Sequence, residues 1–552
     1  MTEVNKFEGI VKETYTKLIE LHPEQSMNIG LSYLDKPLPD LSKNTIPVER
    51  GLIQIQLEKL KEINVVELPI DKRLDYLAFV DYLKLRLFFI DEWPIWKMYP
   101  EAPDIAFNMI INVYLKRDLS NKEKLRYILG KLEELPTFLE KSKSRLETPV
   151  QLFIDAGILS SQNLMLLVRG IYNDFITKED ISGEVGAKKR IFDIALGSIE
   201  AYIEWLQKLR EREIRDFTMG KQLYEKLLKL RRVEDSLDEL EKEIVKDMNQ
   251  YHTELQKIAG ELDKERNINR VIEKIMEEYP RTSTVALSLY NHGLLEVKKI
   301  IKEKKILDLP EIEVEVVPVP TMIKETLPEI YYFPSFKQAG EIKTVEVYIN
   351  LSEEPELLKL HNAYFALHRI LQVIYPGYHV IFTNTVLNNN KVRIMLDIPE
   401  VYEGWSMYSD FLMAEYGFLT SRKDNFIRQL YIYRNALLAY LDIKVNTGEM
   451  KHVDALKRLV EDGYMQRSEA VAHILKMVIS PSLSLSSYIG FKAIWSLRKA
   501  LKEFLKNNYS DRWFNNEFLK NSALPINFMK IIMLDRALKI LMEREFMNFK
   551  IE

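Results

Sequence analysis

KQLYEKLLKLRRVEDSLDELEKEIVKDMNQYHTELQKIAGEL, residues 221–262, is the stretch that decides the fold class. Its apolar residues recur at steps of three and four, and charged residues fill most positions between them. This spacing is typical of a long amphipathic helix or a helical hairpin. Such a helix either packs on its own domain or forms an intermolecular coiled coil. The apolar positions are Leu223, Leu227, Leu230, Val233, Leu237, Leu240, Ile244, Met248, Tyr251, Leu255, Ile258 and Leu262.

On the N-terminal side, helical spacing of apolar residues extends from about residue 5 to about residue 215. Turn signals interrupt it at KPLPDLS from Lys36, MYPEAPD from Met98, ELPTF from Glu134 and ETPV from Glu147. Proline-containing polar clusters of this kind separate helices. The sequence therefore predicts a series of packed helices in this half of the chain.

On the C-terminal side, two short segments alternate apolar and polar residues. They are EIEVEVVPVP from Glu311 and KTVEVYIN from Lys343, and the aromatic LPEIYYFPSF between them is predicted to be extended. We expect a mainly α, large multi-helix fold with a small central β-sheet. Its regions are an N-terminal helical region (1–215), a long amphipathic helix or helical hairpin (216–305), and a small sheet with a helical core (306–552).

The composition excludes several classes of function. The 78 Lys and Arg residues face 82 Asp and Glu residues, a net charge of -4, so neither nucleic acid nor an anionic membrane is an expected partner. The chain has no cysteine, which excludes disulfides, thiolate zinc sites and a cysteine nucleophile. The Lys, Glu and Ile content would suit a thermophile.

The N-terminal residues MTEVNKFEGIVKETYTKLIELHPEQ mix both charges and contain no apolar core of a signal peptide. The most apolar stretches, such as YLAFVDYLKLRLFFIDEW from Tyr76, are interrupted by charges before they reach the ~18 residues that a membrane span needs. These features predict a cytoplasmic protein without a membrane partner.

Two motifs carry a family resemblance. QVIYPGYH, residues 372–379, resembles a pattern HExxPGHH, and EGWSMYSDFLMAEYG, residues 403–417, resembles EGWxLYxExLxxExG. Three later segments agree in order: AYLDIKVNTGEM (439–450), PSLSLSSYIGFKAIWSLRKA (481–500) and FLKNSALPINFM (518–529). This set resembles the domain of unknown function 885 family. The resemblance implies a helical fold like that of zinc metallopeptidases.

In such enzymes a His-Glu pair supplies a metal ligand and the general base, and a second His and a Glu complete the metal site. Here Gln372 stands at the first ligand position and Val373 at the position of the general base. Tyr378 replaces another histidine, and Asn446 stands where the family usually has one. The resemblance therefore implies a degenerate metal motif without an intact catalytic set. His379 and Glu403 are the residual metal candidates.

We expect these positions to lie beside a deep cleft, with Glu403 and His379 on its walls and the strands along one side. A relocated metal site is an alternative, because His361, His368 and Gln372 share a helix face. Aromatic residues at helical spacing could also belong to the core. The candidate cleft-lining residues are Gln372, Tyr378, Trp405, Tyr408, Asn446 and Tyr488.

The preferred functional hypothesis is a non-catalytic homologue of zinc metallopeptidases that retains a cleft for a peptide or protein ligand. One alternative is a metal-dependent, peptidase-like hydrolase with an altered or relocated metal site. A second is a helical scaffold protein. No cofactor is expected, and zinc bound by the residual candidates is the alternative.

Overall fold

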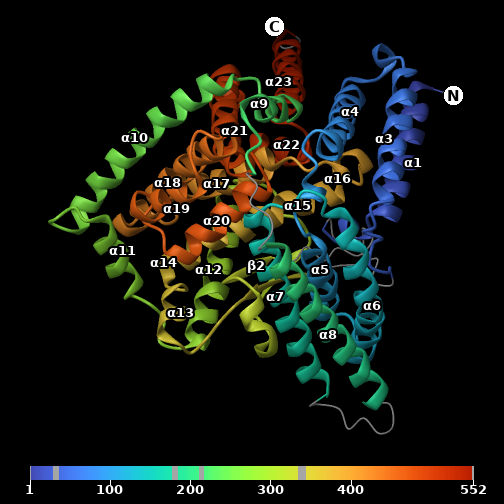
Figure 1. Ribbon diagram of the computed structural model, residues 1–552. Coiled ribbons are helices and arrows are strands. Elements are labelled where there is room, and N and C mark those ends of the chain that lie inside the picture. The colour runs from blue at the N-terminus through green and yellow to red at the C-terminus, as the bar shows by residue number, and fades with distance from the viewer. Residues whose placement is uncertain (1, 29–35, 177–184, 211–216, 333–343, 550–552) are drawn as a thin grey trace.

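The computed structural model describes residues 2–28, 36–176, 185–210, 217–332 and 344–549 (Figure 1). Helices dominate these residues, and a single small sheet lies among them. The prediction of a mainly α fold with a small sheet is confirmed. Figure 1 shows the N-terminal helices on one side of the molecule, α1 (Glu3–Leu21), α3 (Thr45–Lys61) and α4 (Ile70–Asp91). On the opposite side it shows α10 (Leu237–Leu262) and α11 (Ile268–Met276).

The N-terminal region is a series of packed helices, as predicted. One predicted break is wrong, because α6 continues through Pro136. Buried Leu132, Leu135 and Phe138 hold that helix in the core, which offsets the backbone hydrogen bond that proline removes. The helices are α1 (Glu3–Leu21), α2 (Pro23–Asn28), α3 (Thr45–Lys61), α4 (Ile70–Asp91), α5 (Ala102–Leu115), α6 (Asn121–Ser142), α7 (Gln151–Ile176) and α8 (Val185–Arg210), with 3-10 turns η1 (Val65–Glu67), η2 (Ile95–Lys97) and η3 (Lys143–Arg145).

The long amphipathic stretch forms two helices, α9 (Lys221–Leu230) and α10 (Leu237–Leu262). Ser236 caps the start of α10 with a capping box. Its hydroxyl accepts from the Glu239 backbone N–H, and the Glu239 side chain accepts from the Ser236 backbone N–H. The α10 helix packs along α18 (Arg422–Asn446), so the stretch lies on its own chain. Two further helices follow, α11 (Ile268–Met276) and α12 (Ser283–Lys304).

The sheet has the strand order β1–β3–β2. Strand β1 (Glu313–Pro318) runs parallel to β3 (Thr344–Ile349), which pairs antiparallel with β2 (Ile330–Tyr332). Both predicted alternating strands are confirmed, and residues 333–336 of the predicted extended segment lie outside the described residues. Because side chains alternate across a sheet, Val347 and Ile349 join one hydrophobic cluster while Tyr348 joins another. The sheet thus separates two cores.

The C-terminal region supplies the helices that carry the family motifs. Helices α17 (Pro399–Glu415) and α21 (Leu483–Leu505) cross closely, since a Cβ added at Gly490 would lie 1.8 Å from the Glu400 carbonyl oxygen. The elements are η4 (Thr321–Thr326), α13 (Pro355–Lys359), α14 (Ala363–Arg369), the π-helical η5 (Ile370–Ile374), α15 (Tyr378–Leu387), α16 (Lys391–Met395), α17 (Pro399–Glu415), α18, α19 (His452–Glu461), α20 (Arg467–Ile479), α21 (Leu483–Leu505), η6 (Lys506–Asn508), α22 (Asp511–Lys520) and α23 (Ile526–Phe549).

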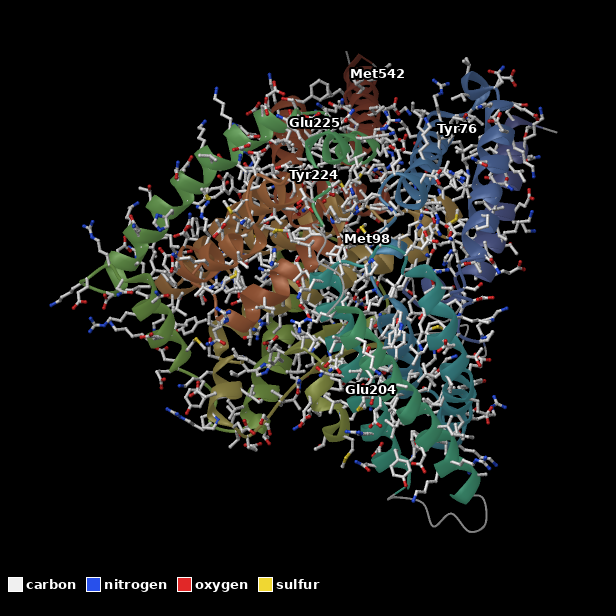
Figure 2. The ribbon with its side chains drawn as sticks, viewed as in Figure 1. Tyr76, Met98, Glu204, Tyr224, Glu225 and Met542 are labelled. Carbon is white, nitrogen blue, oxygen red and sulfur yellow. The ribbon has the colours of Figure 1, made fainter. Side chains whose placement is uncertain are left out.

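The hydrophobic clusters join distant parts of the sequence. The largest one runs from Phe7 to Ala537 and draws on all three predicted regions. Within the described residues, one helix, over Gln151–Phe175, is long and apolar enough to cross a membrane, or two if the bent pair α20–α21 counts as one span. The Gln151–Phe175 helix is part of α7, which contributes buried residues to the hydrophobic cluster that contains Tyr348. At the far end of α23, Met542 is exposed, whereas Tyr224 of α9 is fully buried (Figure 2).

Candidate functional site

The first motif lies where α14 passes into the π-helical segment η5. The Gln372 side-chain amide donates to the Asp410 Oδ2 atom at 3.3 Å, and Val373 packs against the main hydrophobic cluster. The position of the expected general base thus holds an aliphatic side chain in an apolar setting. It cannot accept a proton there.

Asp410 is the centre of a fully buried polar cluster. His368 Nδ1 lies 2.7 Å from Asp410 Oδ2, and the Arg428 Nε–H donates to Oδ1 at 3.0 Å. Burial would raise the pKa of the Asp410 carboxyl, but the charges and hydrogen bonds of His368 and Arg428 outweigh it and lower that pKa. The carboxylate is therefore ionised and neutralised within the protein.

His361, the other histidine considered for a relocated metal site, lies apart from this cluster. Its Nδ1 contacts the Tyr290 hydroxyl at 3.0 Å and its Nε2 contacts the Asn350 carbonyl oxygen at 3.0 Å. Burial lowers the pKa of His361 to about 4. Its ring is neutral near pH 7, with both nitrogens in use.

The second motif contributes Glu403, and the structure brings it to Tyr378 of the first. The Tyr378 hydroxyl donates to Glu403 Oε2 at 2.5 Å, and Lys476 Nζ lies 3.7 Å from Oε1. Burial and the nearby Glu403 carboxylate raise the pKa of Tyr378 well above its usual value. The tyrosine thus remains a neutral donor to the glutamate.

His379 lies beside Tyr378 in sequence but is fully buried at the sheet. Its Nε2 lies 3.0 Å from the Ile312 carbonyl oxygen, and its Nδ1 lies 3.2 Å from the Tyr332 hydroxyl. Burial lowers the pKa of His379 to about 4. Because it is 0% exposed, His379 does not stand on the wall of an open cleft, contrary to our expectation.

Four predicted cleft residues belong to the interior instead. Trp405, Tyr408 and Asn446 are 0% exposed and Tyr488 is 2% exposed. Each has a protein partner: the Trp405 indole donates to the Pro376 carbonyl oxygen, Tyr408 to Asn515, Tyr488 to Asp247, and the Asn446 amide to Asp442. These side chains are core residues, as the alternative explanation for aromatics at helical spacing expected, although the buried Asn446 Oδ1 atom has no hydrogen-bond partner in the described part of the chain.

The residues present do not fit a zinc site. Within the described ranges, no group of three His, Asp or Glu side chains could hold a metal ion. Both ring nitrogens of His379 already have partners, and Glu403 is bonded to Tyr378. A metal would have to displace one of the His379 contacts before that histidine became a ligand.

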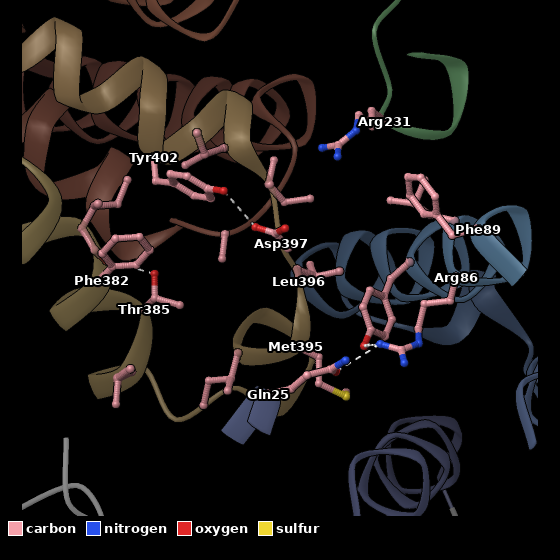
Figure 3. Close-up of a pocket in the computed structure, with 18 residues that line it drawn as sticks. Gln25, Arg86, Phe89, Arg231, Phe382, Thr385, Met395, Leu396, Asp397 and Tyr402 are labelled. Carbon is pink, nitrogen blue, oxygen red and sulfur yellow. Dashed lines mark hydrogen bonds between the residues drawn. The ribbon is translucent and has the colours of Figure 1, made fainter. Parts of the chain in front are cut away.

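A cavity of about 570 Å³ lies next to the motif helices, between α4, α15, α16 and the start of α17 (Figure 3). Its walls are largely apolar, with Phe89 on one side and Phe382 and Tyr402 on the other. None of the six predicted cleft residues lines it. The sequence reasoning missed this cavity, because its walls come from elements far apart in the chain and no local pattern joins them.

Two arginines line the cavity. Arg86 is held by Glu49, whose Oε1 accepts from its Nε–H at 2.9 Å, and by Gln25 and Tyr82. Arg231 follows the last residue of α9 and points toward the cavity (Figure 3). One carboxylate, Asp397, also lines the space and accepts from the Tyr402 hydroxyl at 3.1 Å. The arrangement can hold an apolar group together with a polar one.

Comparison with solved structures gives two overall similarities. A "putative lipoprotein of unknown function" from Shewanella oneidensis matches with a TM-score of 0.75 and 18% identity, over 96% of this chain and 99% of that one. A "putative lipoprotein" from Colwellia psychrerythraea matches with a TM-score of 0.79 and 15% identity, over 98% of this chain and 100% of that one. At these identities the likeness shows a shared fold. No curated protein matches the chain.

These structures correct one prediction. We expected a cytoplasmic protein, from the charged N-terminal residues and the interrupted apolar stretches. Both structural relatives carry the description "putative lipoprotein", which contradicts that expectation. The absence of an apolar N-terminal core was therefore an insufficient basis for a location.

A family model described as "Bacterial protein of unknown function (DUF885)" matches residues 23–533. This match confirms the resemblance carried by the two motifs and the three later segments. It covers nearly all of the 552 residues. The chain therefore belongs to the domain of unknown function 885 family.

Proposed function

We propose that this protein is a non-catalytic relative of zinc metallopeptidases that binds a peptide. The binding site in this proposal is the cavity between α4, α15 and α17. No cofactor and no nucleic acid takes part in it. The cavity carries the proposal, because it is bounded by the helices of both family motifs and has the size and lining of a ligand site.

The chemistry of the motif residues argues against hydrolysis. Val373 cannot serve as a general base, and the Gln372 amide is a neutral donor and acceptor bonded to Asp410. Tyr378 donates to Glu403, the remaining acidic metal candidate. A metal-bound water would therefore lack both its ligands and its general base.

The cavity supports binding by its size and its walls. Ligand sites usually measure about 300–1,000 Å³ and combine apolar walls with a few polar groups. At about 570 Å³, this cavity falls within that range, and Phe89, Phe382 and Tyr402 provide aromatic surface. It suits one or two apolar residues of a short peptide.

Isothermal titration calorimetry of the full chain with the tripeptide Ala-Leu-Phe tests this proposal. We expect saturable binding that weakens at least tenfold in Leu85→Trp, because Leu85 lines the cavity and a larger side chain would occupy it. The matched control is Leu159→Trp, which makes the same change at a side chain that is 48% exposed. Equal loss in both variants, or no binding by the wild type, would overturn the proposal.

Product analysis of the same mixtures separates binding from hydrolysis. Chromatography should recover the tripeptide intact after long incubation, with or without added zinc. Cleavage that a chelator abolishes would instead support the metal-dependent hydrolase with an altered site.

A further inference from the structure

Arg231 is the polar group in the cavity whose hydrogen-bonding needs are unmet. Its side chain is only 11% exposed. Its Nε and Nη1 atoms are buried and have no hydrogen-bond partner in the described part of the chain. Buried donors on a charged group cost stability when they lack an acceptor. An acceptor supplied from outside would remove that cost.

The nearest carboxylate does not meet this need. Glu400 Oε1 lies 3.9 Å from Arg231 Nη1, which allows electrostatic attraction but is too long for a hydrogen bond. The same oxygen already accepts from the Ser486 hydroxyl at 2.6 Å. Arg231 is thus loosely paired with Glu400, and its buried donors lack the hydrogen bond that a better-placed acceptor would supply.

The second arginine of the cavity shows the opposite arrangement. Arg86 donates to Glu49 Oε1 at 2.9 Å, to Gln25 at 3.2 Å and to the Tyr82 hydroxyl at 3.1 Å. Its charge and its donors are therefore used within the fold. Of the two guanidinium groups in this cavity, Arg231 is the one that can serve a ligand.

We propose that Arg231 binds the carboxylate of a ligand whose apolar body fills the rest of the cavity. This inference rests on the proposed function, and for a peptide it assigns the free C-terminal carboxylate next to an apolar last residue. Guanidinium groups form strong charge-assisted hydrogen bonds with carboxylates. Asp397 in the same cavity disfavours a second negative charge, so a monocarboxylate fits better than a phosphate.

A pair of peptides tests the inference on the wild-type chain. Ala-Leu-Phe carries the free carboxylate, and its C-terminal amide carries a neutral carboxamide in the same place. We expect the acid to bind at least tenfold more tightly than the amide in calorimetry. Equal binding of the two peptides would overturn the carboxylate inference and leave the proposed function intact. Failure of both to bind would overturn the proposed function itself.

Two substitutions locate the effect. Arg231→Gln should abolish the preference for the acid while amide binding persists. The matched control, Arg232→Gln, removes the same charge from the next residue, whose side chain pairs with Asp81 and does not line the cavity, and it should keep the preference. Loss of the preference in both variants, or in neither, would contradict the assignment.

Glu400→Gln provides a variant with the opposite expectation. The glutamine oxygen can still accept from Ser486, while the carboxylate that attracts Arg231 is removed. We expect the acid to bind more tightly to this variant, by at least threefold, and the amide to bind unchanged. Unchanged or weaker acid binding by a folded Glu400→Gln protein would show that Arg231 does not serve the ligand.

Octanoate distinguishes the source of the carboxylate. It has an apolar body and one carboxylate but no peptide group. Weak binding compared with Ala-Leu-Phe supports a peptide ligand. Octanoate binding that depends on Arg231 and is tighter than tripeptide binding would keep the carboxylate inference and overturn the peptide as its source.

Discussion

Replacing Gly490 by alanine places a methyl group inside the crossing of α17 and α21. The new Cβ would lie 1.8 Å from the Glu400 carbonyl oxygen and 3.0 Å from the Gly404 Cα atom. Both are backbone atoms of the opposing helix, so no side-chain rotation relieves the contact. The helices must separate for the variant to fold.

The free energy of unfolding should fall by about 2 kcal/mol or more. Overpacking a core costs roughly 1–3 kcal/mol, and the rigid backbone here favours the upper end. Alanine recovers about 0.5–1 kcal/mol relative to glycine in a helix interior, which offsets only part of this cost. Separation of the helices would also disturb Glu400, whose side chain accepts from Ser486 of α21.

Gly197→Ala is the matched control, because Gly197 also lies within a helix but an added Cβ there would meet no atom within 4 Å. This variant should gain about 0.5–1 kcal/mol. Urea and thermal unfolding, followed by far-UV circular dichroism, compare the two proteins with the wild type. The reasoning would be refuted if Gly490→Ala unfolded at the same midpoint as Gly197→Ala, or above it.

Two further outcomes follow from the motif residues, and a third follows from His22 at the end of α1, whose ring contacts Glu24 and Glu49. A chelator should leave the melting temperature unchanged, because the described residues form no cluster that could hold a stabilising metal. A fall of several degrees would contradict this. The triple variant Gln372→His, Val373→Glu, Tyr378→His should bind zinc more tightly than the wild type. It restores the ligand types of the family motif and frees Glu403 from the Tyr378 hydroxyl. A zinc affinity no higher than that of the wild type would show that the motif is misaligned. Burial opposes protonation of His22, but hydrogen bonds to carboxylates raise its pKa from 6.5 to about 9. The protonated His22 ring therefore stabilises the fold fully below pH 6.5, and this stabilisation, at most about 3 kcal/mol, is lost as the pH rises through 9. His22→Gln should make the melting temperature less dependent on pH over that interval. An unaltered slope of melting temperature against pH would refute this prediction.

The sheet could be predicted because its pattern is local. Strand β1 alternates exposed glutamates with apolar residues, and Val316 is buried while Glu315 is exposed. Strand β3 repeats the alternation with Val345 and Val347 buried. A period of two in the sequence maps directly on the two faces of a strand, so no tertiary information is needed.

The break between α9 and α10 was signalled in the sequence, although apolar periodicity alone concealed it. Val233 keeps the three- and four-residue spacing while lying between the helices. The better signal is Ser236 followed three residues later by Glu239, which forms a capping box. Apolar spacing reports which residues are buried, and capping residues report where a helix begins.

The cavity and its open arginine could not be predicted in the same way. Arg231 stands in a run of charged residues, where a solvated side chain is the ordinary expectation. It becomes distinctive only when α9 packs on α4 and the start of α17 lies near it. The unmet hydrogen bonds are a property of the tertiary structure, so no window of the sequence contains them.

The retained and altered motif residues differ in what their side chains contact. Trp405 and Gly404, which agree with the family pattern, support the packing of α17 through an indole hydrogen bond to Pro376 and a close crossing with α21. Gln372 and Tyr378, which depart from it, instead bond the carboxylates Asp410 and Glu403. In the function that we propose, a metal has been lost, and polar groups that stay buried after such a loss need other partners. The two substituted side chains supply such partners, so a fold that needs the motif for packing can persist without the chemistry that the motif resembles.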